Sequence, residues 1–379
     1  MARRILIACI ALLASILMVE GVVRLMAPQP RHSPWARMAP LGLSHLPGSA
    51  IDAWGQGSLV HHQSNMEGFI DVPHTPVRIP GVRRVAVLGD SFVEAIQVPL
   101  EQKCTRRLEA ILNHSGETAW EVLDFGVAGA GTAGELLVYR DHARKYNPDV
   151  VILCFFLGND VLNNHPDLDP KRDKPFLRVV DHRAVSWSTG SPGIAPDLPG
   201  GWVSGLLDVS HLARLLNSRL QALRLHRART DSTGLPRDFQ VFNRTAVPAW
   251  EEAWKVTSDV LGVLAGECAA DHAELLIVAV PDRIQVHEEA WRACRNDYPA
   301  LTSEQFDPAL PNARLTAICA DRGIPMLDLT PHLQRLALTG HMLYFPDDGH
   351  WNETGNDAAA ECIAARLRED WRQPPTIEP

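Results

Sequence analysis

The hydrophobic residues of the chain follow two different patterns. Residues 5–26 form one nearly continuous apolar stretch, preceded by Arg3 and Arg4 and interrupted by Glu20 and Arg24. Further along, short apolar runs alternate with segments whose apolar residues recur at helical spacing. Strands that alternate with helices are typical of a parallel sheet covered by helices on both faces, so the sequence predicts an α/β fold.

Five strands are predicted in the alternating part. They are residues 85–88, 120–123, 150–156, 275–280 and 326–329. Residues 150–156 are apolar at every position, as expected of a central strand that is buried on both faces. The predicted helices are residues 101–113, 133–146, 250–270, 312–321 and 353–369. This order of elements predicts a sheet with helices on each side.

The remaining segments define the organisation of the chain. Residues 27–80 are rich in proline and predict a linker followed by short extended segments. The main domain is expected to span residues 81–372, with an insertion at about 161–245 that contains a basic, helix-like stretch at 212–229. The insertion either covers the site, docks a partner or is a plain surface excursion.

The N-terminal stretch predicts a membrane anchor over residues 1–26. A spanning helix needs about 20 apolar residues, and Glu20 and Arg24, four positions apart, can pair near an interface. The leading arginines favour a cytoplasmic N-terminus and an exported body, periplasmic or extracellular. A cleaved signal peptide and a buried N-terminal helix are the alternatives, but no clean small-residue cleavage site follows the apolar stretch.

Composition restricts the possible partners. The 379 residues carry a formal net charge of -9, which argues against a nucleic-acid partner. The seven cysteines include no CxxC pair and no Cys/His cluster with zinc-ligand spacing, so we expect neither a metal nor another cofactor. Cys154 lies inside a predicted strand and is expected to be a free thiol. Pairing among the other cysteines stays open.

A serine follows the first predicted strand, and a histidine precedes the closing helix. Ser91 comes directly after Val-Leu-Gly-Asp, where its hydroxyl would lie at the carboxyl edge of the sheet. A serine hydroxyl needs a base before it is a useful nucleophile, and His350 would be that base. An acidic residue must orient the imidazole, and Asp347 is our first choice, with Asp348 as the alternative.

Two further blocks would supply hydrogen-bond donors. Gly129 follows the second strand, where a glycine lets the backbone approach a ligand closely. Asn159 follows the third strand and carries a side-chain amide. The Ser91 N–H, the Gly129 N–H and the Asn159 side chain would together form an oxyanion hole of three donors.

These blocks, in this order, resemble the SGNH (GDSL) hydrolase superfamily. Gly89-Asp90-Ser91-Phe92 is similar to its first block, with Phe in place of the usual Leu. Gly129 and Asn159 match its second and third blocks, and Asp347 with His350 its closing Asp-x-x-His. The resemblance covers roughly residues 84–160 and 270–368. It implies a flavodoxin-like three-layer αβα sandwich with a five-stranded parallel sheet, and acyl transfer to serine without metal.

A looser resemblance concerns the flanking segments. The apolar stretch that ends Glu20-x-x-x-Arg24-Leu25, and Ser64-Asn65-x-x-Gly68-Phe69, look like membrane-anchored bacterial members, some of which modify envelope polysaccharides. The Asp348-x-His350-Trp351 sequence is similar to alginate-acetylation proteins, which place the acid two residues before the histidine. Asp124 stands where many members have Asn, so its supporting contact is not predicted.

Three functions are compatible with this pattern. The first is a serine esterase or deacetylase that acts on acyl esters, with O-acylated envelope carbohydrate or lipid as candidate substrates. The second is an O-acyltransferase that uses the same residues and a sugar hydroxyl as acceptor. The third is a catalytically silent binding or assembly protein. With His350 as base, activity is expected to fall on acidification through an apparent pKa of about 6 to 7.

Overall fold

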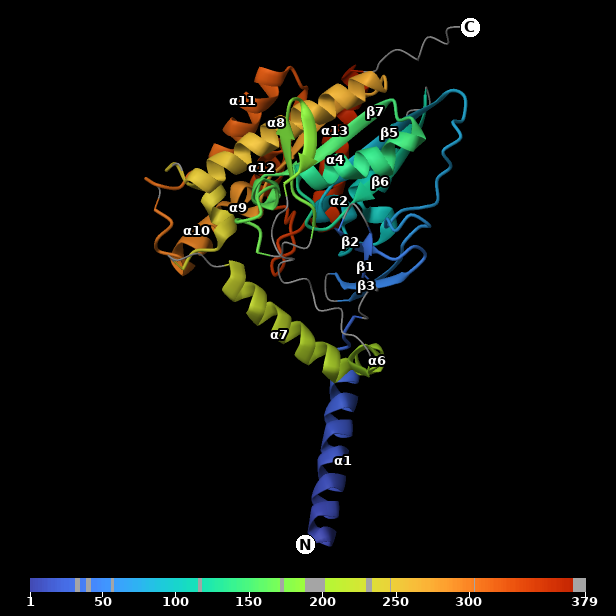
Figure 1. Ribbon diagram of the computed structural model, residues 1–379, viewed down its shortest axis with the longest axis vertical. Helices are drawn as coiled ribbons and strands as arrows, with labels where there is room; N and C mark the ends of the chain where they lie inside the picture. The colour runs from blue at the N-terminus through green and yellow to red at the C-terminus, as the bar shows by residue number, and fades with distance from the viewer. Residues whose placement is uncertain are drawn as a thin grey trace.

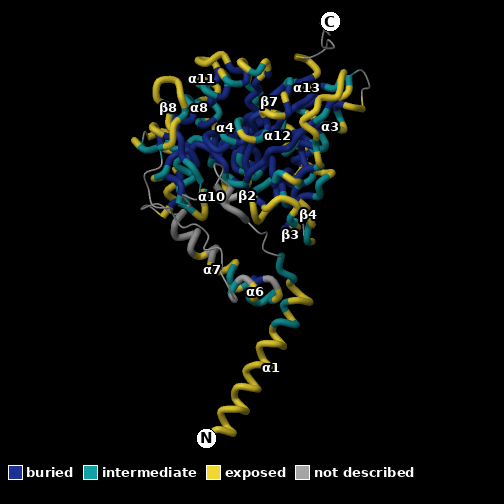
Figure 2. The backbone as a smooth tube through the Cα atoms, turned by 45° about the vertical axis from the view of Figure 1, so that its right-hand side comes forward, coloured by how far each residue is buried: buried dark blue, intermediate teal, exposed yellow. Residues whose placement is uncertain are grey.

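A long helix stands apart from the rest of the molecule. The computed structural model describes residues 1–30, 35–38, 42–55, 58–114, 118–170, 174–187, 202–229, 234–245, 247–302 and 304–370. Figure 1 shows α1 (Ala2–Met26) projecting from a compact body, with α6 (Trp202–Val209) and α7 (His211–Arg229) between the two. Within the described residues, α1 is the one helix long and apolar enough to cross a membrane, and Figure 2 shows it exposed along most of its length.

The body is built on one parallel sheet. Its strands are β5 (Val82–Gly89), β6 (Ala119–Gly126), β7 (Val150–Phe156), β10 (Glu274–Val280) and β11 (Met326–Asp328). They lie in the order β11-β10-β7-β5-β6, and each neighbouring pair is parallel. The predicted five-stranded parallel sheet is therefore confirmed.

Side-chain alternation along the strands creates two cores. In β7, Val151, Leu153 and Phe155 belong to one buried cluster, while Ile152 and Cys154 belong to the other. Successive residues of a strand point to opposite faces, so a strand apolar at every position requires cover on both sides. The helices on the two faces supply that cover, which gives the predicted three layers.

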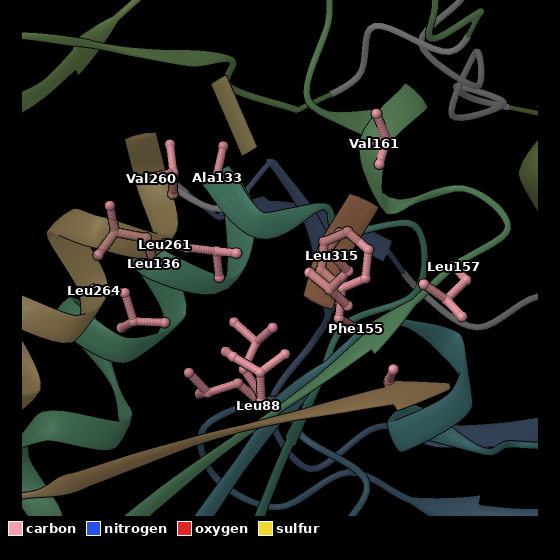
Figure 3. Packing of buried hydrophobic residues seen from close by; sticks show 14 of the residues in the cluster. Leu88, Ala133, Leu136, Phe155, Leu157, Val161, Val260, Leu261, Leu264 and Leu315 are labelled. Atoms are coloured by element: carbon pink, nitrogen blue, oxygen red, sulfur yellow. The ribbon is translucent and has the colours of Figure 1, made fainter. Parts of the chain in front are cut away.

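Each face of the sheet has its own set of helices. The first cluster includes residues of α4 (Thr132–Asp141), α8 (Pro248–Ala270), α9 (Arg283–Val286), α10 (Glu288–Asp297) and α11 (Leu310–Arg322). Figure 3 shows part of this face, where Leu88 and Phe155 of the sheet lie opposite side chains of α4 and α8. The second cluster includes residues of α2 (Ser91–Glu94), α3 (Cys104–His114), α12 (Thr330–Leu338) and α13 (Glu353–Asp370).

Short elements occupy the linker and the insertion. Three antiparallel hairpins are formed by β1 (Trp35–Met38) with β2 (Gly42–His45), β3 (Ala50–Trp54) with β4 (Leu59–Gln63), and β8 (Leu177–Val180) with β9 (Arg183–Ser186). The basic stretch of the insertion is the helix α7, as its sequence predicted. The helix expected over 133–146 is divided, because α4 ends at Asp141 and a 3₁₀ turn, Ala143–Tyr146, follows.

Two local predictions can be checked directly. Glu20 and Arg24 form the predicted ion pair, with 2.9 Å between Arg24 Nη2 and Glu20 Oε1. All seven cysteines fall within the described residues and are free thiols. Cys154 is buried, as expected for a core position in β7.

Candidate active site

Ser91 sits at the first position of α2, directly after β5. Asp90 caps this helix, because its side chain accepts a hydrogen bond from the Phe92 N–H at 2.9 Å. The cap turns the chain sharply at the carboxyl edge of the sheet. As a result, Ser91 Oγ lies 2.8 Å from His350 Nε2, although 259 positions separate the two residues.

The helix α2 is packed directly on the ends of two strands, through its backbone at β6 and through a side chain at β5. A Cβ atom on Gly126, at the end of β6, would come within 2.1 Å of Glu94 N. A Cβ on Gly89, at the end of β5, would come within 2.4 Å of Val93 Cγ2. Only glycine allows this approach, so these two positions determine how deeply Ser91 is seated.

His350 is held by a short loop before α13. The Phe345 N–H donates to the His350 carbonyl at 2.8 Å, and an isolated bridge joins Tyr344 to Trp351. The Phe92 ring lies against the imidazole, with 5.0 Å between ring centroids. The loop and the ring therefore orient Nε2 toward Ser91.

The carboxylate beside His350 is Asp348. Its Oδ1 accepts the His350 N–H at 2.9 Å and lies 3.3 Å from His350 Nδ1. At this distance Asp348 and His350 form an ion pair. The two atoms do not form a hydrogen bond, and the buried Nδ1 has no hydrogen-bond partner. Catalytic hydrogen bonds are often long before substrate binds. Asp347, our first choice, and Asp348 are both exposed, and the ion pair of His350 is formed with Asp348.

The charges around His350 change its proton affinity. Burial alone would lower the pKa of His350, but the contact with Asp348 and the charges of Asp90 and Glu94 outweigh it and raise that pKa above its usual value. The same pairing lowers the pKa of Asp348, although its burial opposes this. Asp348 is therefore an anion at neutral pH, as an orienting acid must be.

The two loops expected to donate hydrogen bonds also meet at this edge. Gly129 has a φ of 73°, which places it in the left-handed region that favours glycine. Asn159 precedes α5 (Asp160–Asn163), and its Oδ1 is buried without a hydrogen-bond partner. The loops pack closely, since a Cβ on Gly131 would come within 2.8 Å of Asn164 Oδ1 and of the Asp160 carbonyl.

Lys174 supports the Gly129 loop and was not foreseen. Its ammonium donates to the Gly129 carbonyl and pairs with Asp169 Oδ2 at 2.7 Å, and its side chain is only 8% exposed. Lys174 belongs to the insertion, 45 positions from Gly129. No motif marks it in the sequence, because its role depends on how the insertion folds back over the sheet.

Three fully buried carboxyl groups lie beneath the site: Asp90, Glu135 and Asp160. Burial raises the pKa of all three, and their mutual repulsion adds to the increase for Glu135 and Asp160. Asp160 Oδ2 accepts the Phe156 N–H at 2.7 Å, whereas neither oxygen of Glu135 has a hydrogen-bond partner.

Across the described parts of the chain, no group of three or more His, Cys, Asp or Glu side chains could hold a metal ion.

The structure also accounts for Asp124, whose contact the sequence did not predict. Its carboxylate is buried and accepts the Thr105 hydroxyl at 2.7 Å and the Gly126 N–H at 3.0 Å. Lys103 Nζ lies 2.9 Å from the same carboxylate and compensates its charge. Asp124 therefore fixes the end of β6, next to the Gly129 loop.

Comparison with known proteins finds a family match in the C-terminal part of the chain. Residues 249–378 match the family model described as "SGNH hydrolase-like domain, acetyltransferase AlgX". The matched segment includes Asp347, Asp348 and His350 but not Ser91. No curated protein matches the chain.

Several solved structures are similar to the chain at low identity. An acetyl xylan esterase, AlAXEase, has a TM-score of 0.42 and 14% identity, over 75% of this chain and 99% of its own. TesA has a TM-score of 0.40 and 13% identity, over 76% and 99%. A two-domain esterase (CEX) active on acetylated mannans has a TM-score of 0.39 and 11% identity, over 79% and 52%.

The fold and the family match define a class of protein. The five-stranded parallel sheet between two helical layers gives an α/β architecture. The matched segment is similar to a family described as an SGNH hydrolase-like domain that includes an acetyltransferase, in agreement with the resemblance of the four sequence blocks.

Proposed function

We propose that the protein transfers an acyl group to Ser91 and then to water, as a membrane-anchored esterase or deacetylase. The observation that carries the proposal is the 2.8 Å contact between Ser91 Oγ and His350 Nε2 at the carboxyl edge of the sheet. Asp348 completes the set as the orienting acid, in place of Asp347. The family description, which names an acetyltransferase, supports an acetyl ester as the substrate class.

The chemistry follows from the positions of these groups. Ser91 Oγ attacks the acyl carbon while His350 Nε2 takes its proton. The negative charge that forms on the carbonyl oxygen is stabilised by the Ser91 N–H, the Gly129 N–H and the Asn159 side chain. When the intermediate collapses, the leaving alcohol takes the proton from His350. His350 then takes a proton from water, whose oxygen attacks the acyl carbon. The bond between Ser91 Oγ and the acyl carbon breaks, the acid leaves, and His350 returns the proton to Ser91 Oγ.

The same residues support the alternative of an O-acyltransferase. In that case the hydroxyl of an acceptor, such as an envelope carbohydrate, replaces water in the second step. The match to a family described by an acetyltransferase favours this alternative specifically. We place the body on the exported side of the membrane, because Arg3 and Arg4 precede α1.

The first experiment labels the full-length protein in detergent with a fluorophosphonate and, separately, with p-nitrophenyl acetate. Mass spectrometry is expected to find one adduct, on Ser91, and Ser91→Ala is expected to lower turnover by at least about a thousandfold. His350→Ala is expected to lose the adduct, while the matched control His61→Ala, at a side chain 70% exposed, keeps it. An adduct on another serine, or full turnover by Ser91→Ala, would contradict the proposal.

A second measurement separates hydrolysis from transfer. Acetylated carbohydrates are offered as donors and unacetylated ones as acceptors to the acyl-enzyme. Faster release of the acyl group with formation of a new ester indicates an acyltransferase. Release that no acceptor changes indicates an esterase.

A further inference from the structure

An apolar stripe on α7 is not covered by the rest of the chain. Leu216, Leu220 and Leu223 lie on one face of the helix and are 56%, 56% and 60% exposed. Leu206 and Val209 of the neighbouring α6 are 45% and 63% exposed. Leucines that recur at this spacing in a helix are normally buried, so this stripe requires a partner.

The charge of α7 is opposite to that of the whole protein. Residues 211–229 contain five arginines and no acidic residue, whereas the chain has a net charge of -9. Arg219 is exposed beside the leucines, while the buried Arg214 donates to the Gln29 carbonyl at 2.7 Å. A basic helix with leucines on one face and an exposed arginine beside them fits an anionic lipid surface.

The position of α7 is fixed by the end of α1. Glu20 accepts the Leu212 N–H at 2.8 Å, the His211 N–H at 3.0 Å and the Ser210 hydroxyl at 2.8 Å. A carboxylate from α1 therefore caps the N-terminus of α7, where backbone N–H groups lack partners and the helix dipole is positive.

Arg24 connects α6 to the same end of α1. It pairs with Glu20 and donates to the Val209 carbonyl, at the end of α6, at 2.6 Å. Both α6 and α7 are thus attached to the last two turns of α1, next to the body (Figure 1). Cleavage of α1 as a signal peptide would remove these contacts, so they favour a retained anchor.

We propose that α6 and α7 form a membrane-surface element, in which the leucine stripe enters the lipid leaflet where α1 leaves the bilayer. Arg219 then binds an anionic head group of that leaflet. This inference rests on the proposed anchoring by α1, and it gives the insertion a role that does not depend on Ser91. The element would hold the body at a fixed height and orientation above the membrane.

The test measures the depth of spin labels in the full-length protein. Cys9, Cys294 and Cys362 are replaced by serine, because the other four cysteines are buried. A nitroxide is then attached at Leu220→Cys or, as the matched control, at Ser218→Cys, an exposed position on the opposite face of α7. Each protein is reconstituted in phosphatidylcholine vesicles with or without phosphatidylglycerol. Collisions with oxygen report lipid, and collisions with a water-soluble nickel complex report water.

We expect the ratio of oxygen to nickel collisions to be severalfold higher at position 220 than at 218, and higher still with phosphatidylglycerol. Equal ratios at the two positions would overturn the proposal. Protection of position 220 from both reagents would also overturn it, because that result indicates a protein partner or a second copy. A label at Leu12→Cys reports anchoring by α1 separately, and hydrolysis of p-nitrophenyl acetate reports the Ser91 site separately.

Discussion

Replacing Asp348 tests which of the two adjacent carboxylates orients His350. Two unit charges 3.3 Å apart, the distance from Asp348 Oδ1 to His350 Nδ1, attract by about 1 kcal/mol in bulk water and about 5 kcal/mol at an effective dielectric constant of 20. The Asp348 side chain is 41% exposed, so solvent screening favours the lower part of this range. We therefore expect Asp348→Asn to cost about 1 to 3 kcal/mol of transition-state stabilisation, or roughly 5- to 150-fold in kcat.

The assay measures the rate of p-nitrophenyl acetate hydrolysis as a function of pH for the wild type, Asp348→Asn and Asp347→Asn. Because its anionic neighbours raise the pKa of His350, the wild-type rate should fall on acidification below a pKa higher than the ordinary value of about 6.5. Asp348→Asn removes the main source of this increase, so its acid limb should move to lower pH. Asp347→Asn should keep both the rate, within about twofold, and the acid limb. A larger loss in Asp347→Asn, or an unmoved acid limb in Asp348→Asn, would refute the assignment.

Two further predictions concern stability. Burial holds the pKa of Glu135 well above its ordinary value, so the folded protein keeps a proton that the unfolded chain loses, and the free energy of unfolding should decrease as pH rises above about 4.3. Glu135→Gln should flatten this decrease in urea unfolding at several pH values, and the exposed Glu361→Gln should not. Leu261→Ala, at a fully buried position of α8, should lower the free energy of unfolding by about 2 to 5 kcal/mol. A loss as small as that of Leu338→Ala, at a side chain 88% exposed, would contradict this packing.

The sheet and the serine–histidine pair follow from features that are local in the sequence. Buried strands such as 150–156 are apolar at every position, as is typical of a parallel strand that is covered on both faces. Ser91 directly follows a strand, and His350 directly precedes a helix, so the carboxyl edge of a parallel sheet brings them together. The position of each residue at the end of an element is therefore the local signal for their meeting, and the set of four blocks made it specific.

The remainder of the site depends on contacts that the sequence does not contain. Asp347 and Asp348 are adjacent carboxylates, and only the turn in which Asp348 accepts the His350 N–H determines which one faces the imidazole. Lys174 reaches Gly129 only after the insertion has folded over the sheet. Glu135 lies in the first turn of α4, where an acidic residue is ordinary, and its full burial beside Asp90 could not be foreseen.

The close seating of α2 on Gly89 and Gly126 limits how this site can be engineered. Any side chain at Gly126 would press on the backbone of α2 at 2.1 Å and lift Ser91 away from the imidazole. A misplacement of about 1 Å can cost on the order of a hundredfold in rate. A library that aims to change the acyl or acceptor preference should therefore keep these two glycines constant.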